Sequence, residues 1–164
     1  MTAEEFKQLF LPQARRMYGV AWRLTQNAAD AEDLVQDTLL RLFERRADLS
    51  APTNAAAYAA QAVYRLFVSQ QRAHTDESAL LDAADAVADS ASPLASLTAR
   101  ELRERWRALA NALPDGQRRV YVLHDVCGLS ADEIGAQTGL AAANVRMLLS
   151  RARRKIRENL QDEL

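Results

Sequence analysis

The sequence predicts an all-α protein of two small helical domains joined by a flexible acidic linker, with a helix-turn-helix in the C-terminal domain. Only 5 of the 164 residues are glycine and 4 are proline, so few positions interrupt a helix. Apolar residues recur at helical spacing on both sides of an acidic stretch. Hydrophobic residues make up 49% of the chain, which is typical of a globular protein rather than a disordered one.

The first domain is expected to span residues 1–73 and to contain three helices. The first helix begins near Pro12, because proline suits an opening turn. Asn27 is the expected N-cap of the second helix, which has a broad apolar face and ends near Ala47. A loop rich in turn-forming residues follows, and the third helix is predicted over about 55–72.

The predicted linker, residues 74–93, is rich in alanine, aspartate and serine and has no aromatic residue to anchor a core. The second domain is expected over residues 94–164. Its first helix should stop at Pro114, and Asp115 should cap a second helix that ends at Gly128.

A short helix, a glycine turn and a longer basic helix then predict the helix-turn-helix. Ser130 and Glu133 have the spacing of a capping box, which begins the short helix. Gly139 can supply the left-handed turn that ends it, and the small Ala136 would let the two helices approach closely. Although the net charge is −1, every charged residue within 141–157 is basic. Such a local block favours contact with nucleic acid at one place.

The basic helix offers two kinds of DNA contact. Its N-terminal part is placed for base edges, and asparagine and arginine are good bidentate readers of adenine and guanine. Its later basic residues suit phosphates, which give affinity and salt dependence rather than sequence choice. A plain solvated basic helix packed on a bundle remains the alternative. The candidates are Ala142, Ala143, Asn144, Arg146 and Met147 for bases, and Arg151, Arg153, Arg154 and Lys155, with Arg157, for phosphates.

Residues 29–38, which read ADAEDLVQDT, resemble a helix of the extracytoplasmic-function (ECF) group of bacterial RNA polymerase sigma factors. The resemblance implies that this helix packs on the clamp helices of the polymerase beta-prime subunit. An acidic face beside an apolar stripe suits a basic partner, but acids early in a helix also complement its dipole. The implied polymerase-binding residues are Asp30, Glu32, Asp33, Leu34, Gln36 and Asp37.

A second stretch, residues 113–157, is similar to the domain of this family that reads the minus-thirty-five promoter element. The residues that carry the similarity are the Gly-Leu-Ser before the short helix, Glu133-Ile134, Val145-Arg146 and the Ser-Arg-Ala-Arg from position 150. The resemblance therefore assigns minus-thirty-five contacts to the residues from Ala142 to Lys155 named above. It covers most of the chain in the family's order, with a fitting linker.

The third helix departs from the family pattern where minus-ten DNA should bind. Tyr58 stands at the family's tryptophan and Arg65 at its asparagine, whereas Arg72 is retained. Within the loop at 48–54 the family captures an unstacked base, although an ordinary surface loop is equally consistent with these residues. The residues expected to contact minus-ten DNA are Asn54, Tyr58, Tyr64, Arg65, Gln71 and Arg72.

The resulting hypothesis is a non-enzymatic sigma factor that binds core RNA polymerase, through its beta-prime clamp helices and beta flap, and directs promoter-specific initiation. The family also implies an anti-sigma partner. Two alternatives stay open: a sigma mimic that sequesters an anti-sigma factor, and a dimeric helix-turn-helix repressor on a palindromic site. No small-molecule substrate is expected.

The remaining residues suggest no catalytic or cofactor chemistry. One cysteine and two histidines are too few for a metal cluster, so neither a metal nor another cofactor is expected. Cys127 is interpreted as a small buried residue, and Trp22 is expected in the core. A chain with one cysteine and no recognisable signal segment is expected in the reducing cytoplasm.

Overall fold

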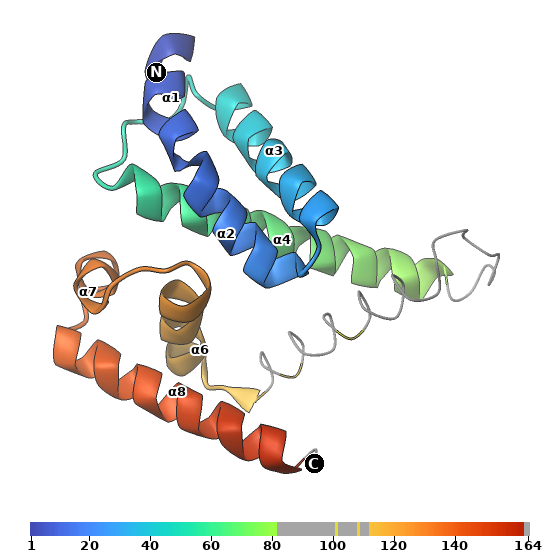
Figure 1. Cartoon of the computed structure of the whole chain (residues 1–164), viewed down its shortest axis with the longest axis vertical. Helices are drawn as coiled ribbons and strands as arrows, with labels where there is room; N and C mark the ends of the chain where they lie inside the picture. The colour runs from blue at the N-terminus through green and yellow to red at the C-terminus, as the bar shows by residue number, and fades with distance from the viewer. Residues whose placement is uncertain (82–100, 102–107, 109–111, 163–164) are drawn as a thin grey trace.

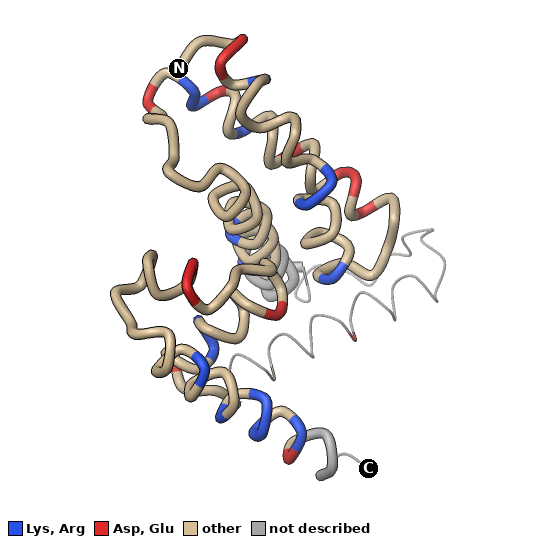
Figure 2. Tube along the Cα trace, turned by 60° about the vertical axis from the view of Figure 1, so that its left-hand side comes forward, with Lys and Arg blue, Asp and Glu red and all other residues tan. Residues whose placement is uncertain are grey.

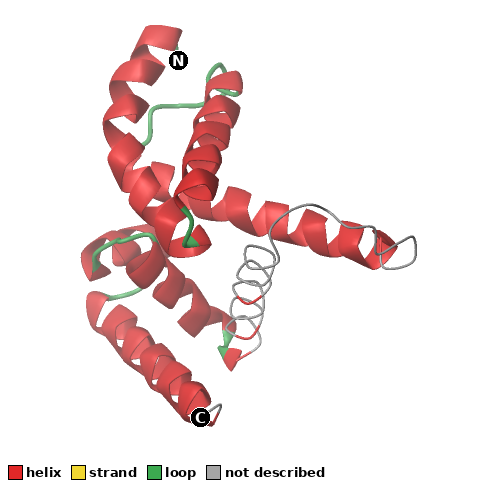
Figure 3. Cartoon of the chain, turned by 45° about the vertical axis from the view of Figure 1, so that its right-hand side comes forward, coloured by secondary structure: helices red, strands yellow, loops and turns green. Residues whose placement is uncertain are grey.

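The computed structural model describes residues 1–81, 101, 108 and 112–162, and these residues form helices joined by short loops (Figure 3). The all-α prediction is confirmed. The helices form two groups, α1 to α4 and α6 to α8, which lie against each other (Figure 1). None of the described helices has the length and apolar character that crossing a membrane demands.

The first group contains five elements, and one of its helices was not anticipated. They are α1 (Ala3–Phe10), the 3₁₀ turn η1 (Leu11–Gln13), α2 (Ala14–Thr25), α3 (Ala28–Glu44) and α4 (Ala55–Leu81). The unanticipated helix is α1, which begins with a capping box. The Thr2 hydroxyl accepts the N–H of Glu5 at 3.1 Å, and the Glu5 carboxylate accepts the N–H of Thr2 at 2.8 Å. The Thr-x-x-Glu spacing was the sequence signal for this helix.

The α2–α3 hairpin agrees with the prediction at its turn. Asn27 is the N-cap of α3, and its side chain accepts the N–H of Asp30. The expectation for Trp22 was wrong, because 42% of its surface is exposed while Met17, Val20 and Leu24 of the same helix are fully buried. Those three residues share the inward stripe of α2, and Trp22 lies outside it.

The long helix α4 continues to Leu81, beyond the end expected near Arg72. No glycine or proline occurs within α4, so no residue breaks the helix at the predicted boundary. The remainder of the predicted linker, 82–93, lies outside the described residues. Side chains from α1, α2, α3 and α4 meet in an apolar core, in which the Phe6 ring lies 4.8 Å from Phe10 and 5.3 Å from Phe43.

The second group contains α6 (Asp115–Tyr121), one turn of π-helix η2 (Val122–Val126), α7 (Ala131–Thr138) and α8 (Ala142–Asp162). Pro114, not Asp115, is the N-cap of α6, and the Asp115 carboxylate instead pairs with Arg118 at 2.7 Å. The helix expected before Pro114 falls almost entirely outside the described residues.

Buried residues of the two groups form one continuous apolar cluster. Cys127, Leu129 and Ile134 of the second group are almost completely buried. The helix α8 lies on the side of the second group that is farther from α4, as two views agree (Figures 1 and 3). One long face of α8 is therefore turned away from the first group.

Candidate nucleic-acid and polymerase interfaces

The turn that positions α8 has the predicted caps. Ser130 Oγ accepts the N–H of Glu133 and a Glu133 carboxylate oxygen accepts the N–H of Ser130, both at 3.1 Å. At the other end of α7, Gly139 has φ 79°, and its N–H donates to the Gly135 carbonyl at 2.9 Å. Left-handed φ values disfavour side chains with a Cβ, so Gly139 ends α7 and turns the chain into α8.

The close approach within this turn occurs at Gly135 rather than at Ala136. A Cβ on Gly135 would lie 2.7 Å from the carbonyl oxygen of Leu140, whereas Ala136 is exposed. The prediction for Ala136 was therefore wrong by one position. Gly135 lets the turn at Leu140 pack closely on the end of α7, and a glycine within a short amphipathic helix was the signal available in the sequence.

The helix α8 has one buried and one exposed face. Val145, Leu149 and Ala152 are buried where α8 packs on the rest of the second group. Ala142 is half-buried at the first turn. The other candidate DNA residues are exposed: Ala143, Asn144, Arg146, Met147, Arg151, Arg153, Arg154 and Lys155. Basic residues gather along this helix (Figure 2), so the helix presents a row of cations to solvent.

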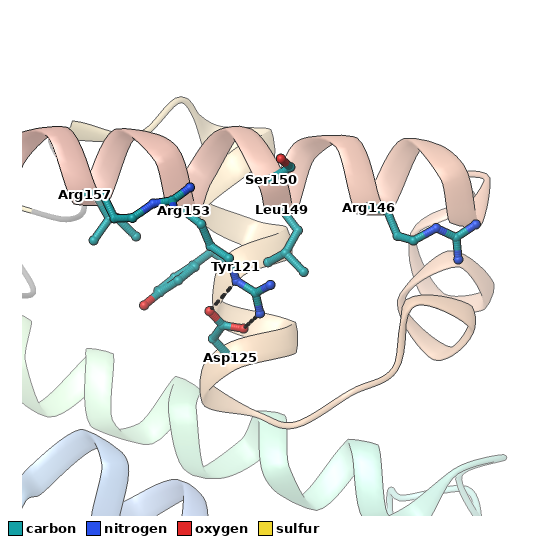
Figure 4. A pocket seen from close by; sticks show the side chains of 8 residues that line it. Tyr121, Asp125, Arg146, Leu149, Ser150, Arg153 and Arg157 are labelled. Atoms are coloured by element: carbon teal, nitrogen blue, oxygen red, sulfur yellow. Dashed lines mark hydrogen bonds and ion pairs between the residues drawn. The ribbon is translucent and has the colours of Figure 1, made fainter.

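Arg153 differs from its basic neighbours because it already has a partner. Its guanidinium donates to both carboxylate oxygens of Asp125, at 2.7 and 3.2 Å, on one side of a cleft of about 670 Å³ between α6 and α8 (Figure 4). Partial burial raises the pKa of Asp125, but hydrogen bonds from Arg153 and His124 outweigh it, so the net pKa is lowered. Arg153 thus links α8 to η2.

The candidate polymerase face lies on the outer side of α3. Asp30, Glu32, Asp33, Gln36 and Asp37 are all exposed, so the structure brings these residues to one surface. Leu34 does not join them, because it is only 4% exposed and packs in the core. Instead Leu40, which is 56% exposed, lies one turn beyond Gln36 and Asp37 on the same side of the helix. Helical spacing groups Leu34 and Leu42 on the apolar face and leaves Leu40 outside it, so the sequence carried a signal for the exposure of Leu40.

The candidate minus-ten residues follow α4 but differ in accessibility. Arg65 and Arg72 are exposed, whereas Tyr58, Tyr64 and Gln71 are half-buried. Tyr58 packs toward the core, with its ring 6.1 Å from that of Phe10. Burial, with a smaller contribution from Cys127, raises the pKa of the Tyr64 hydroxyl.

Asn54 has a double role at the start of α4. Its side-chain oxygen accepts the N–H of Ala57 at 3.1 Å, which caps the helix. Its amide nitrogen donates to the Glu133 carboxylate at 2.6 Å, across the boundary between the two groups. One candidate minus-ten residue is therefore engaged with the helix-turn-helix.

Together these features define a helical DNA-binding protein with an exposed basic helix and a separate acidic helix face. Residues 9–76 match Sigma-70 region 2, and residues 103–156 match Sigma-70, region 4. The chain is 32% identical to the RNA polymerase sigma factor CarQ of Myxococcus xanthus, over 96% of this chain and 90% of that protein. The chain belongs to the ECF group of RNA polymerase sigma factors.

Two further likenesses extend this result. The ECF RNA polymerase sigma factor SigE of Mycolicibacterium smegmatis is 32% identical over 93% of this chain, which spans 60% of that relative's length. The sigma factor RpoE of Bartonella quintana, solved with the anti-sigma factor NepR, matches with a TM-score of 0.57 and 27% identity. That alignment covers 97% of this chain and 98% of that one.

Proposed function

We propose that the chain is an alternative sigma factor, which binds core RNA polymerase and directs promoter-specific initiation without catalysing a reaction itself. The observation that carries the proposal is the exposed face of α8, where Asn144, Arg146 and Arg151 are presented to solvent by the tight turn at Gly135 and Gly139. An α-helix held in this way fits the major groove of DNA.

The second part of the proposal assigns polymerase binding to α3. The exposed acids of α3 include Asp33 and Asp37, which lie one turn apart. Their negative charge would steer this face toward a basic surface, which the clamp helices of the beta-prime subunit are expected to provide. Leu40 continues this face with apolar surface that binding would remove from water. The buried Leu34 supports the helix from behind.

The third part assigns minus-ten DNA to α4. The exposed Arg65 and Arg72 can contact phosphates, while the half-buried Tyr64 can stack on an unpaired base. Tyr58 is placed too close to the core for stacking and is better suited to hold α4 against Phe10. Asn54 would contact DNA only after releasing Glu133.

Membership of this family also supports two further partners, the beta flap of the polymerase and an anti-sigma factor. A chain of this kind would act in the cytoplasm, where the polymerase is, and its second group would contact the beta flap. An anti-sigma factor is proposed as its regulator, since the RpoE structure that it resembles contains one.

The test is transcription in vitro. Core polymerase alone and core polymerase with the chain are supplied with genomic DNA, and the 5′ ends of the transcripts are sequenced. New start sites that share two upstream elements are the expected result. Absence of any new start site, together with no binding to core polymerase, contradicts the proposal.

A matched pair of variants sharpens this test. Asp37→Lys reverses a charge on the exposed face of α3, and Glu4→Lys makes the same change on the exposed side of α1. The first should weaken binding to core polymerase by about tenfold or more, in line with coupling of ~1.5 kcal/mol for close charge pairs, and the second should not. Equal affinities would remove α3 from the interface.

A further inference from the structure

Three arginine side chains of the first group converge on the segment that joins η2 to α7, which passes close to α2 and α4 (Figure 1). The Arg16 guanidinium of α2 donates to the Gly128 carbonyl at 3.2 Å. Arg23 reaches the same glycine, because a Cβ on Gly128 would lie 3.9 Å from its Nη2. Burial raises the pKa of the neighbouring Cys127 thiol to about 12, and the positive charges of Arg23, Arg16 and Arg65 oppose this rise.

Glycine forms part of the surface between these arginines. Arg23 folds back over Gly19, the residue one turn earlier on α2, where a Cβ would lie 4.0 Å from both Nη1 and Nη2 of Arg23. Gly128 is exposed and Gly19 is half-buried. Because neither glycine has a side chain, a ligand can approach the Arg23 guanidinium over bare backbone. Arg23 and Arg65 are exposed, and Arg16 is half-buried, so all three are accessible from solvent.

The positive charge of this cluster has little compensation within the described part of the chain. There, the arginines that pair with a carboxylate within 4.0 Å are Arg118, Arg153 and Arg154. The pKa of Glu133 is lowered first by the N–H of Ser130 and least by Arg16, so this carboxylate does not neutralise the cluster. Guanidiniums gathered without an anion repel one another, and an anion from solution would relieve that repulsion.

The third member of the cluster is a departure from the family pattern. Arg65 stands where the resemblance places an asparagine of the family. Guanidinium groups bind phosphate oxygens in pairs, with strong charge-assisted hydrogen bonds. The exchange of an asparagine for an arginine therefore adds a phosphate-binding group beside the two arginines of α2.

We propose that Arg16, Arg23 and Arg65 form a binding site for a compact anion with two adjacent phosphate groups, where α2 and α4 meet the segment at Gly128. Two phosphates are expected rather than one, because the donors come from two turns of α2 and from α4. A single phosphate would meet fewer of them. The site adds to the proposed function and does not depend on it.

Calorimetric titration of the full chain with inorganic pyrophosphate, in metal-free buffer at low ionic strength, tests the site. Saturable binding of one pyrophosphate per chain is the expected result. Orthophosphate at the same ionic strength should bind about tenfold more weakly, since it loses at least one charge-assisted contact. Absence of saturable binding, or equal affinities for the two anions, would overturn the inference.

Two variants and a matched control locate the binding. Arg23→Gln and Arg65→Asn, the second of which restores the family's asparagine, should each weaken pyrophosphate binding by about tenfold. Arg15→Gln removes the same charge from an exposed position elsewhere on α2 and should leave the affinity unchanged. Thermal unfolding verifies that each variant is folded. An equal loss in all three variants would mean that only the overall charge attracts the anion, and would contradict the site.

Two further probes distinguish the sources of phosphate. Adenosine diphosphate binding more tightly than pyrophosphate would identify a nucleotide as the ligand, and weaker binding would identify an inorganic diphosphate; both results support the site. Single-stranded DNA of mixed sequence is the second probe. If Arg23→Gln and Arg65→Asn weaken binding of this DNA but leave pyrophosphate binding unchanged, the arginines are nucleic-acid contacts only and the inference fails. Neither polymerase nor promoter enters these measurements, so their outcome is separate from that of the sigma-factor proposal.

Discussion

Arg153 and Asp125 form a two-pronged ion pair that fastens the middle of α8 to η2. The Asp125 side chain is 24% exposed and that of Arg153 is 48% exposed, so the pair is partly screened by solvent. An arginine that the sequence suggested for phosphate contact is thus held by the protein itself. It helps to fix the angle at which the rest of α8 is presented.

Removing this pair should lower stability modestly and change its pH dependence. Asp125→Asn should reduce the free energy of unfolding by about 1 kcal/mol near neutral pH, the upper end for a partly exposed pair. Because the folded pKa of Asp125 is lowered, its contribution is present above the unfolded pKa, about 3.9, and is lost as the pH falls through the folded value. Urea titrations at a series of pH values from neutral to acid should show that the free energy of unfolding falls less with pH in Asp125→Asn than in the wild type.

The exposed pair of Arg154 and Glu158, 3.3 Å apart and one turn along α8, provides the control. Glu158→Gln should leave the free energy of unfolding nearly unchanged. A similar loss in both variants would show that the Arg153–Asp125 pair has no special role.

The turn between α7 and α8 depends on Gly135. Gly135→Ala would place a methyl group 2.7 Å from the carbonyl oxygen of Leu140, which is backbone and cannot move aside cheaply. We expect a loss of about 1–3 kcal/mol in the free energy of unfolding, as for other overpacked sites. Gly116→Ala, in the first turn of α6, meets no atom within 4 Å and should be neutral or slightly stabilising. Chemical denaturation of both variants decides the comparison.

Leu40 should contribute to polymerase binding through its apolar surface, although it lacks the charge of the acidic residues on the same face of α3. Leu40→Lys is expected to weaken the complex with core polymerase by about tenfold, since burying a leucine side chain contributes ~1.5 kcal/mol or more. Leu11→Lys makes the same change at another exposed leucine, on η1, which is 53% exposed. Fluorescence anisotropy with labelled chain measures both, and thermal unfolding checks that neither variant is misfolded. Equal weakening would point to a general charge effect.

Two arginines on α8 should differ in how they contribute to promoter binding. Arg146→Ala should weaken binding of the holoenzyme by ~1–3 kcal/mol and relax the choice of base at one position of the upstream element. Arg151→Ala should weaken binding on all sequences alike and reduce the slope of log affinity against log salt by about 1. Binding to a promoter library at several salt concentrations separates these outcomes. Arg15→Ala, on the exposed side of α2, serves as a charge-matched control.

Local chemistry explains which parts of the fold were predictable. Capping residues act over three positions, so Asn27, Ser130 and Gly139 could be assigned from the sequence. The capping box of Thr2 and Glu5, which begins α1, has the same local sequence signal. The end of α4 was misplaced because acidic composition alone does not stop a helix that lacks glycine and proline.

The candidate interfaces were predictable only in part, for a different reason. Helical spacing leaves Trp22 outside the buried face of α2, and it places Leu34 inside and Leu40 outside the buried face of α3, as the structure has them. Trp22 was expected in the core because of its residue type, and Leu34 was assigned to the polymerase interface because of the family resemblance, so in both cases spacing was the better guide. The bonds from Asn54 to Glu133 and from Arg153 to Asp125 join positions far apart in the chain. A single sequence carries no signal for such pairings.

The bonds between the two helix groups also determine how the molecule should respond to ionic strength. The bonds between Gln61 of α4 and Gln137 of α7 join two uncharged amides. The bonds of Arg16 to the Gly128 carbonyl and of Asn54 to Glu133 each pair one charged group with an uncharged one, so neither is an ion pair. Contacts of arginine with phosphate weaken steeply in added salt, whereas hydrogen bonds with an uncharged member respond much less. Raising the salt concentration should therefore strip the chain from DNA long before it parts the groups. The ionic medium is therefore expected to control whether the chain is bound to DNA, and to leave the arrangement of its two helix groups unchanged.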